Sequence, residues 1–167
     1  MTSVDYRGMR LILPENDSEF LGYFAAAARH ELVVKRCSSC GLLRHPPGPG
    51  CPWCTSLDWS WHAVSGKGTI YSYEITMHSV QPGFRDLTPY PVVVVELDEQ
   101  RGIPTPGDGI RIIANLVDEE FHPEAEANVA IGARVKVVFQ DLGEEISLPQ
   151  FALSDEVPLE PLWRFPG

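Results

Sequence analysis

Alternating and continuous apolar positions divide the second half of the chain into five predicted strands. Residues 69–78 alternate between two faces, and residues 91–97 form a β-branched run with the length of a central strand. Three further apolar segments follow at residues 110–117, 133–139 and 147–153. Pro149 makes the last strand the weakest of the five. Five short strands without a long helix predict a mainly β fold, a small closed or nearly closed barrel of the OB type.

The alternation also predicts which side chains of the first barrel strand share a face. The residues expected on one side are Thr69, Tyr71, Tyr73, Ile75 and Met77.

The N-terminal part has a weaker pattern, which predicts an extended arm followed by a short helix. Residues 1–15 show no clear period. Residues 16–19 (Asn-Asp-Ser-Glu) offer polar capping groups and an acid, which are typical of a helix start. One apolar stripe then consists of Phe20, Leu21, Phe24, Ala25 and Ala28. Packing on this domain and docking on a partner both remain open for this stripe.

All four cysteines lie between these two parts, as two Cys-x-x-Cys pairs separated by ten residues: Cys37, Cys40, Cys51 and Cys54. Two thiolates three positions apart on a tight turn can bind one face of a tetrahedral Zn²⁺, and a second pair closes the other face. Two disulfides or four buried thiols are the alternatives. The paired spacing, together with a start that leads into no apolar signal core, favours one structural zinc ion per chain.

Short strands flank this predicted zinc ribbon. Residues 31–36 form a strand entering it, and Trp59 and Trp61 alternate with polar residues on a strand leaving it. The two indoles are expected to cover the ribbon. A break at residues 65–68 marks the boundary with the barrel. The expected units are an arm and helix (1–30), a zinc ribbon (31–64), an OB-fold barrel (65–153) and a tail (154–167).

The sequence offers no convincing catalytic constellation. Four thiolates complete the zinc coordination, so this zinc would stabilise structure without activating water. His45 could replace a ligand but is expected to be a loop or surface residue. A phosphate-binding glycine loop and a Gly-x-Ser-x-Gly elbow are both missing from the sequence. His78, near Glu74 and Asp86, is the best acid–base candidate, although a lone histidine at a strand end is commonly an ordinary polar residue. No catalytic residue is assigned.

The formal charge of −10 is unevenly distributed. Between Glu96 and Glu126 there are nine acidic residues and two basic ones, whereas a small basic cluster beside the cysteines contains Lys35, Arg36 and Arg44. A polynucleotide would require a broader basic face. The composition is that of a soluble globular protein, and no apolar run is long enough to span a bilayer. The cytoplasm is therefore the expected location.

A helix, a four-cysteine ribbon and an OB-type barrel in this order resemble the DUF35 family of rubredoxin-like zinc ribbons fused to OB-folds. The resemblance covers about residues 18–153. The matching segments are residues 37–41, 47–54, 66–72, 90–97 and 132–138. Gly66-Lys-Gly-Thr-Ile-Tyr together with the valine-rich strand makes the resemblance more specific than the zinc motif alone.

The resemblance implies a non-catalytic companion of a thiolase-like enzyme that processes acyl-CoA. The first candidate for the partner enzyme is an aldolase related to lipid-transfer proteins, which cleaves a steroid-side-chain CoA thioester by a retro-aldol reaction. A thiolase or a MaoC-type hydratase is the next candidate. For such a complex, Lys35, Arg36 and Arg44 are the candidates for binding CoA phosphates. The candidates for partner anchors are Phe20, Phe24, Trp163 and Phe165.

Two other classes of function remain open. One is a single-stranded nucleic-acid-binding OB protein, against which the acidic barrel counts. The other is an autonomous hydrolase of CoA thioesters.

Overall fold

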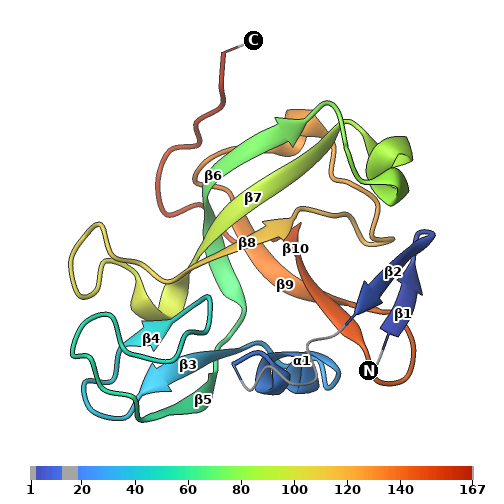
Figure 1. Ribbon diagram of the computed structural model, residues 1–167. Helices are drawn as coiled ribbons and strands as arrows, with labels where there is room; N and C mark the ends of the chain where they lie inside the picture. The colour runs from blue at the N-terminus through green and yellow to red at the C-terminus, as the bar shows by residue number, and fades with distance from the viewer. Residues whose placement is uncertain (1–2, 13–18, 167) are drawn as a thin grey trace.

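The computed structural model describes residues 3–12 and 19–166, which form a five-stranded barrel beside a three-stranded ribbon (Figure 1). Of the predicted helix start at residues 16–19, only Glu19 lies within the described residues. No described helix combines the length and the apolar character needed to cross a membrane.

The barrel is one antiparallel sheet with the strand order β10-β9-β6-β7-β8. Its strands are β6 (Lys67–Thr76), β7 (Tyr90–Leu97), β8 (Arg111–Asn115), β9 (Arg134–Asp141) and β10 (Ser147–Leu153). The edge strands β8 and β10 approach each other where a parallel bridge joins Leu116 to Phe151. The sheet therefore closes almost completely, which confirms the predicted mainly β fold with an OB-type barrel.

Short 3₁₀ turns occupy three of the barrel connections: η1 (Pro82–Leu87), η2 (Asp98–Gln100) and η3 (Glu126–Asn128). The core lies inside the barrel, where alternate residues of the β-branched run, Val93, Val95 and Leu97, are fully buried. Phe151 of β10 joins the same cluster. The period of two along β7 thus places the valine side chains that hold the barrel together.

The predicted alternation along β6 is wrong at Tyr71. The register of β6 against β7 shifts between Ile70 and Ser72, so Tyr71 is an extra residue without a cross-strand partner. Ile70 is fully buried, whereas Tyr71 is exposed and carries the Arg111 guanidinium 3.8 Å from its ring centroid. Because a bulge adds one residue to the strand, the side chains after it point to the opposite face from the one that simple alternation predicts. The five residues predicted to share a face therefore do not all lie on one face.

The ribbon is a three-stranded antiparallel sheet in the order β4-β3-β5. It comprises β3 (Val33–Cys37), β4 (Leu43–Arg44) and β5 (Trp59–Ala63). A short connection leads from β5 into β6, and Val64 N donates a hydrogen bond to Leu32 O over 2.9 Å.

The predicted extended arm is wrong, because residues 3–12 form a hairpin of β1 (Ser3–Tyr6) and β2 (Met9–Ile12). Arg7 and Gly8 make its two-residue turn with φ values of 55° and 74°. Such a turn usually has Asn or Asp before the glycine. Because arginine stands at that position here, the sequence gives no clear signal for the turn. Tyr6 fixes the hairpin on the barrel through its ring contact with Phe84, at a centroid distance of 6.0 Å.

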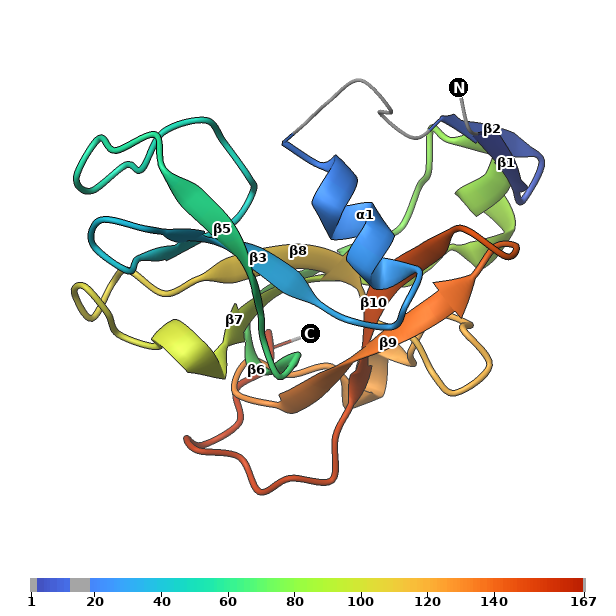
Figure 2. The ribbon, with the colours of Figure 1, turned by 90° about the horizontal axis from the view of Figure 1, so that it is seen from below.

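The helix α1 (Leu21–Ala27) lies between the ribbon and the β9–β10 side of the barrel (Figure 2). Its buried face consists of Tyr23, Ala26 and Ala27. The predicted stripe is therefore wrong, since Leu21 and Ala25 are exposed. Packing sets the rotation of the helix, because a Cβ atom at Gly22 would lie only 2.0 Å from Trp61 Nε1.

The Gln100 side chain joins the barrel to the ribbon. Its Oε1 accepts a hydrogen bond from Leu43 N at 2.6 Å, and its Nε2 donates to Leu43 O at 2.7 Å. Both hydrogen bonds are buried. The Gln100 side-chain amide therefore pairs with both the backbone N–H and the backbone C=O of Leu43 in β4. The two units are thus held in a fixed relation at this point.

Replacing Gln100 by alanine is expected to lower the free energy of unfolding by about 2–4 kcal/mol, because two buried backbone groups would lose their partner. Urea unfolding followed by tryptophan fluorescence measures the change. Gln81→Ala is the matched control, because that residue is exposed on the η1 side and its side chain makes no hydrogen bond among the described residues. Equal stability of both variants would contradict a structural role for the Gln100 amide.

Candidate metal centre and neighbouring surfaces

The four cysteine sulfurs lie together at the end of the ribbon, all within 4.8 Å of one another. Cys37 Sγ is 3.5 Å from Cys54 Sγ, and Cys40 Sγ is 3.6 Å from Cys51 Sγ. A disulfide would require about 2 Å. Sulfurs placed tetrahedrally at 2.3 Å from one Zn²⁺ would be about 3.8 Å apart. The geometry therefore fits a closed four-thiolate zinc site and excludes the two-disulfide alternative.

The two knuckles repeat the same backbone pattern. In the first, Gly41 N donates to Cys37 O at 3.0 Å and Cys37 N to Leu42 O at 2.9 Å. In the second, Thr55 N donates to Cys51 O and Cys51 N to Ser56 O, both at 2.9 Å. Gly41 and Thr55 occupy equivalent left-handed positions, with φ values of 77° and 62°. Glycine adopts this backbone conformation freely, whereas threonine rarely does. The contacts around the second knuckle therefore maintain the positive φ of Thr55.

Backbone amides favour the thiolate form that a metal requires. The hydrogen bond from the Cys40 amide is the main cause that lowers the pKa of the Cys37 thiol to about 6. When Zn²⁺ is bound, it supplies the structural cross-link between the two knuckles, with Cys37, Cys40, Cys51 and Cys54 as its ligands.

His45 lies half-buried in the loop between the two cysteine pairs, with its ring centroid 5.5 Å from that of Tyr23. Burial lowers its pKa to about 4, so the imidazole is neutral at pH 7.

The three basic residues predicted for CoA phosphates lie in different environments. Lys35 is fully buried, pairs with Glu19, donates to Gly48 O at 3.2 Å and lies 3.6 Å from the centroid of a Trp59 ring. Arg36, the next residue of β3, is exposed. Arg44 is the cross-strand partner of Lys35 and is buried. Direct phosphate binding stays a prediction for Arg36 and Arg44, whereas Lys35 already has its contacts inside the protein.

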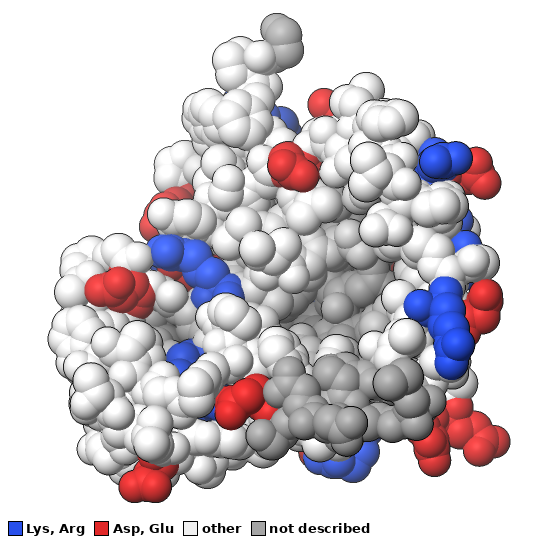
Figure 3. Space-filling model, viewed as in Figure 1, with Lys and Arg blue, Asp and Glu red and all other residues white. Residues whose placement is uncertain are grey.

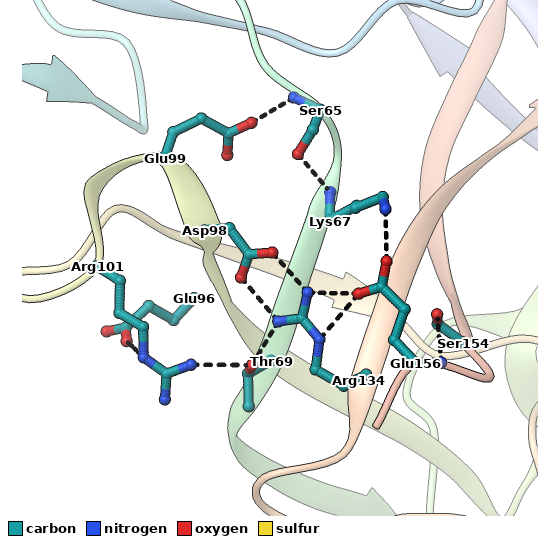
Figure 4. Close-up of polar contacts among 10 residues, drawn as sticks. All are labelled: Ser65, Lys67, Thr69, Glu96, Asp98, Glu99, Arg101, Arg134, Ser154 and Glu156. Carbon is teal, nitrogen blue, oxygen red and sulfur yellow. Dashed lines mark hydrogen bonds and ion pairs between the residues drawn. The ribbon is translucent and has the colours of Figure 1, made fainter. Parts of the chain in front are cut away.

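The tail that follows β10 begins at an ion-pair network around the buried Arg134 side chain (Figure 4). The Arg134 guanidinium donates to Asp98 at 2.7 and 2.5 Å and to Glu156 at 3.2 and 2.7 Å. Hydrogen bonding to Asp98, and then to Glu156, raises the pKa of Arg134 above its usual value. Further along the tail, Glu160 accepts from Arg101 Nη2 at 3.1 Å. Charge-assisted hydrogen bonds thus fasten the first half of the tail.

The second half of the tail is held by its backbone while its side chains remain exposed. Ile131 N donates to Trp163 O at 2.8 Å, Trp163 N to Ile131 O at 3.0 Å, and Phe165 N to the Tyr73 hydroxyl at 3.1 Å. Even so, Trp163 is 47% and Phe165 57% exposed. The last residues project beyond the end of the barrel that faces away from the ribbon (Figure 1). We call residues 154–166 the aromatic tail.

Phe20 and Phe24, the other predicted anchors, are both half-buried, with ring centroids 6.5 Å apart. Phe24 packs against the domain's own core. A role for either residue in binding a partner stays a prediction. His78 is exposed and makes no hydrogen bond to Glu74 or Asp86 in the described part of the chain.

Acidic and basic side chains are scattered over the face shown in Figure 3, with blue and red groups close together. The middle of this face is hollowed. A groove of about 420 Å³ lies between the N-terminal hairpin and the β8 and β10 edges, with Leu11, Ile113 and Leu148 among its lining residues. The described residues on this face form no continuous basic track of the kind that binds a polynucleotide.

Two family models match adjoining parts of the chain. The rubredoxin-like zinc ribbon domain of ChsH2 matches residues 24–60, and the C-terminal OB-fold domain of ChsH2 matches residues 61–140. A DUF35 domain-containing scaffold protein of Methanothermobacter thermautotrophicus is 31% identical over 118 residues, which cover 70% of this chain and 77% of that protein. The chain belongs to the DUF35 family.

This DUF35 chain is also similar to parts of larger proteins. A probable enoyl-CoA hydratase alpha subunit of Thermomonospora curvata is 38% identical over 77% of this chain and 35% of its own length. A 3-oxo-4,17-pregnadiene-20-carboxyl-CoA hydratase alpha subunit of Mycobacterium tuberculosis is 27% identical over 78% and 37%. The chain thus spans about a third of each of these two relatives.

Among solved structures, a chain of the Ltp2-ChsH2(DUF35) aldolase matches this DUF35 chain with a TM-score of 0.67 and 35% identity. The match covers 84% of this chain and 98% of the other. The zinc ribbon and the barrel therefore have a counterpart of nearly the same extent in a solved aldolase complex.

Sequence inspection found the cysteines and the aromatic residues of the tail but missed Gln100 and Arg134. Gln100 contacts Leu43, which is 57 positions away in the chain. Arg134 of β9 contacts Asp98 of η2 and Glu156 of the aromatic tail. Neither residue belongs to a local motif, so only the three-dimensional structure identifies them.

Proposed function

We propose that this chain is a non-catalytic zinc-ribbon and OB-fold subunit of a thiolase-like, acyl-CoA-processing complex. Its partner is an aldolase of the lipid-transfer-protein type, which cleaves a steroid-side-chain CoA thioester by a retro-aldol reaction. The Ltp2-ChsH2(DUF35) aldolase supports the kind of partner. The Mycobacterium tuberculosis relative, named for a pregnadiene-carboxyl-CoA substrate, supports the substrate class.

The observation that carries this proposal is the aromatic tail. A terminal segment normally frays unless it is fixed, and an isolated domain gains nothing from holding apolar side chains in water. Here ion pairs and backbone hydrogen bonds fix the segment, yet its large apolar side chains stay exposed: Val157, Leu159, Leu162, Trp163 and Phe165. Rigid aromatic residues at a protein surface are the usual anchors of a stable interface.

In the proposed complex the chemistry belongs to the partner. This chain supplies a rigid surface on which the partner folds or stays folded, and helps to enclose the acyl-CoA as a shared ligand. The structural zinc maintains the ribbon part of that surface. We propose a cytoplasmic location for the complex, because zinc-bound thiolates suit a reducing compartment.

A hydratase complex is the second candidate, because two relatives are named as hydratase alpha subunits. In that case the same chain would accompany a MaoC-type hydratase domain. The two candidates differ in the enzyme that binds the aromatic tail.

Co-expression with an aldolase of the lipid-transfer-protein type, and separately with a MaoC-type hydratase, tests the proposal. We expect co-elution with the aldolase in size-exclusion chromatography and at least tenfold lower retro-aldol activity when this chain is left out. The isolated chain is expected to be inert towards CoA thioesters. Separate elution together with full aldolase activity in its absence would overturn the proposal, and co-elution with the hydratase alone would favour the second candidate.

A further inference from the structure

The two edges of the barrel sheet meet at one end only. A parallel bridge joins Leu116 to Phe151, and Val117 N donates to Phe151 O at 2.8 Å. Residues 111–115 of β8 and residues 147–150 of β10 have no backbone pairing with each other in the described chain. The groove of about 420 Å³ between the hairpin and these two edges lies along this open part, and we call it the seam groove.

The outer edge of β8 presents main-chain groups that no described strand pairs with. Leu97 N donates to Ile110 O at 3.0 Å. At the other end of the strand, Leu116 N donates to Pro91 O at 3.4 Å. Because backbone directions alternate along a strand, the even-numbered residues of β8 turn their N–H and C=O groups towards β7. The N–H and C=O groups of Ile113 therefore point away from β7, towards the open edge.

The facing edge of β10 offers little hydrogen bonding in the middle of the groove. Leu142 N donates to Ile146 O at 2.8 Å, and Ser154 N donates to Arg134 O at 2.9 Å, so the even-numbered residues of β10 turn towards β9. Pro149, which lines the groove, therefore lies at a position that turns away from β9. Proline has no N–H to donate. A segment in the groove would thus hydrogen-bond to β8 and only pack against β10.

The side chains around the seam groove are apolar or uncharged. Its walls include Leu11 of β2, Val92 of β7, Ile113 of β8 and Leu148 of β10, and none of its lining residues carries a charged side chain. Ile113 is 73% exposed in the middle of the β8 edge. Proteins usually protect such an edge with charge, proline or a covering segment. An uncharged edge with an exposed β-branched residue is therefore suited to pairing with a further strand.

A single extended segment fits this groove better than a second folded copy of the chain. The groove is a hollow between β8 on one side and the β1–β2 hairpin with β10 on the other (Figure 3). A strand that belongs to a folded copy would bring its own neighbouring strands against the hairpin wall. A segment without neighbours needs only the spacing of one strand, about 4.8 Å from β8.

We propose that the seam groove receives an extended, uncharged segment of a partner protein, which adds one strand to the outer edge of β8. The main-chain groups of Ile113 bind the segment, and its alternate apolar side chains pack between Ile113 and Leu11. Assigning the segment to the partner enzyme rests on the proposed function. The unpaired edge and the apolar walls do not depend on it, and the seam groove shares no residue with the aromatic tail.

Nuclear magnetic resonance of the isotope-labelled, zinc-loaded chain tests strand addition without a partner enzyme. The probe is a capped hexapeptide of alternating threonine and valine, and its control is the same peptide N-methylated at every residue, which has no N–H to donate. We expect the first peptide alone to shift the Ile113 amide signal and to slow its hydrogen exchange at least tenfold. No response, or an equal response to both peptides, would overturn the inference.

Ile113→Lys places a charge in the seam groove and is expected to weaken binding of the hexapeptide at least tenfold. The variant should fold, because this side chain is exposed. Ile103→Lys is the matched control, since Ile103 is another exposed isoleucine, at 59%, and does not line the groove. Unchanged affinity of Ile113→Lys would contradict the proposal. Slow exchange of the Ile113 amide in the free chain would also contradict it, by showing that the edge is already covered.

Hydrogen exchange of residues 111–115 in the co-expressed aldolase complex separates this inference from the proposed function. Slower exchange in the complex than in the free chain would support the assignment to the partner enzyme. An active complex in which the aromatic tail is protected and Ile113 exchanges freely would refute that assignment and leave the companion role intact. If no aldolase associates, the proposed function fails, and the peptide titration still decides whether β8 accepts a strand.

Discussion

Replacing Cys51 by serine is expected to abolish stoichiometric zinc binding and to unfold the ribbon. The four sulfurs already lie 3.5–3.6 Å apart in pairs, close to the spacing that one zinc ion imposes, and none has another covalent partner. The binding free energy of structural zinc sites of this type is about 10–16 kcal/mol, and it acts as folding free energy. The loss of a large part of this free energy would be greater than the free energy of unfolding expected for a unit this small.

The measurements are elemental analysis for zinc and thermal unfolding of the purified variant. Ser56→Ala is the control, because Ser56 lies in the same knuckle and supplies a side-chain hydroxyl without binding metal. A Cys51→Ser protein that keeps one zinc per chain and unfolds at the temperature of the unmodified protein would show that the metal is held differently.

Replacing Trp163 and Phe165 together by alanine is expected to weaken the proposed complex with an aldolase by at least about 30-fold for each side chain that acts as an anchor. The two rings contact each other at a centroid distance of 4.7 Å, and Phe165 also touches Tyr73 at 5.1 Å, so they present one joined surface. The backbone bonds of Trp163 to Ile131 do not depend on the indole. The variant should therefore remain folded.

Surface plasmon resonance with immobilised aldolase measures the change in dissociation constant. Leu57→Ala, an exposed apolar residue of the ribbon, is the matched control for a general loss of apolar surface. Unchanged affinity of a folded double variant would place the interface elsewhere, with Phe20 and Leu21 of the helix region as the next candidates.

The sequence predicted the parts of this protein that follow from short-range patterns. Paired cysteines at fixed spacing indicated the zinc site, and the period-two or continuous apolar segments indicated all five barrel strands. These signals are local, since the spacing of Cys37 and Cys40 or the run from Val92 to Val95 has the same meaning in any fold.

Features that depend on tertiary packing were not predictable in the same way. The face of α1 is set by the contact of Gly22 with Trp61, and the bulge at Tyr71 by the pairing of β6 with β7. The burial of Lys35 depends on the Trp59 ring, which comes from another strand of the ribbon. Charge clustering in the sequence therefore identified the basic residues near the zinc site, but could not distinguish a buried lysine from an exposed arginine.

The ion-pair network at Arg134 couples the aromatic tail to the stability of the barrel. Arg134 is buried among Thr69, Asp98 and Glu156, and only Glu156 belongs to the tail. A chain cut after β10 would remove an ionic partner from the barrel as well as the surface proposed to bind the partner. A shortened protein could lose partner binding through a folding defect alone. The aromatic tail is therefore better probed by substituting exposed side chains that make none of these ion pairs.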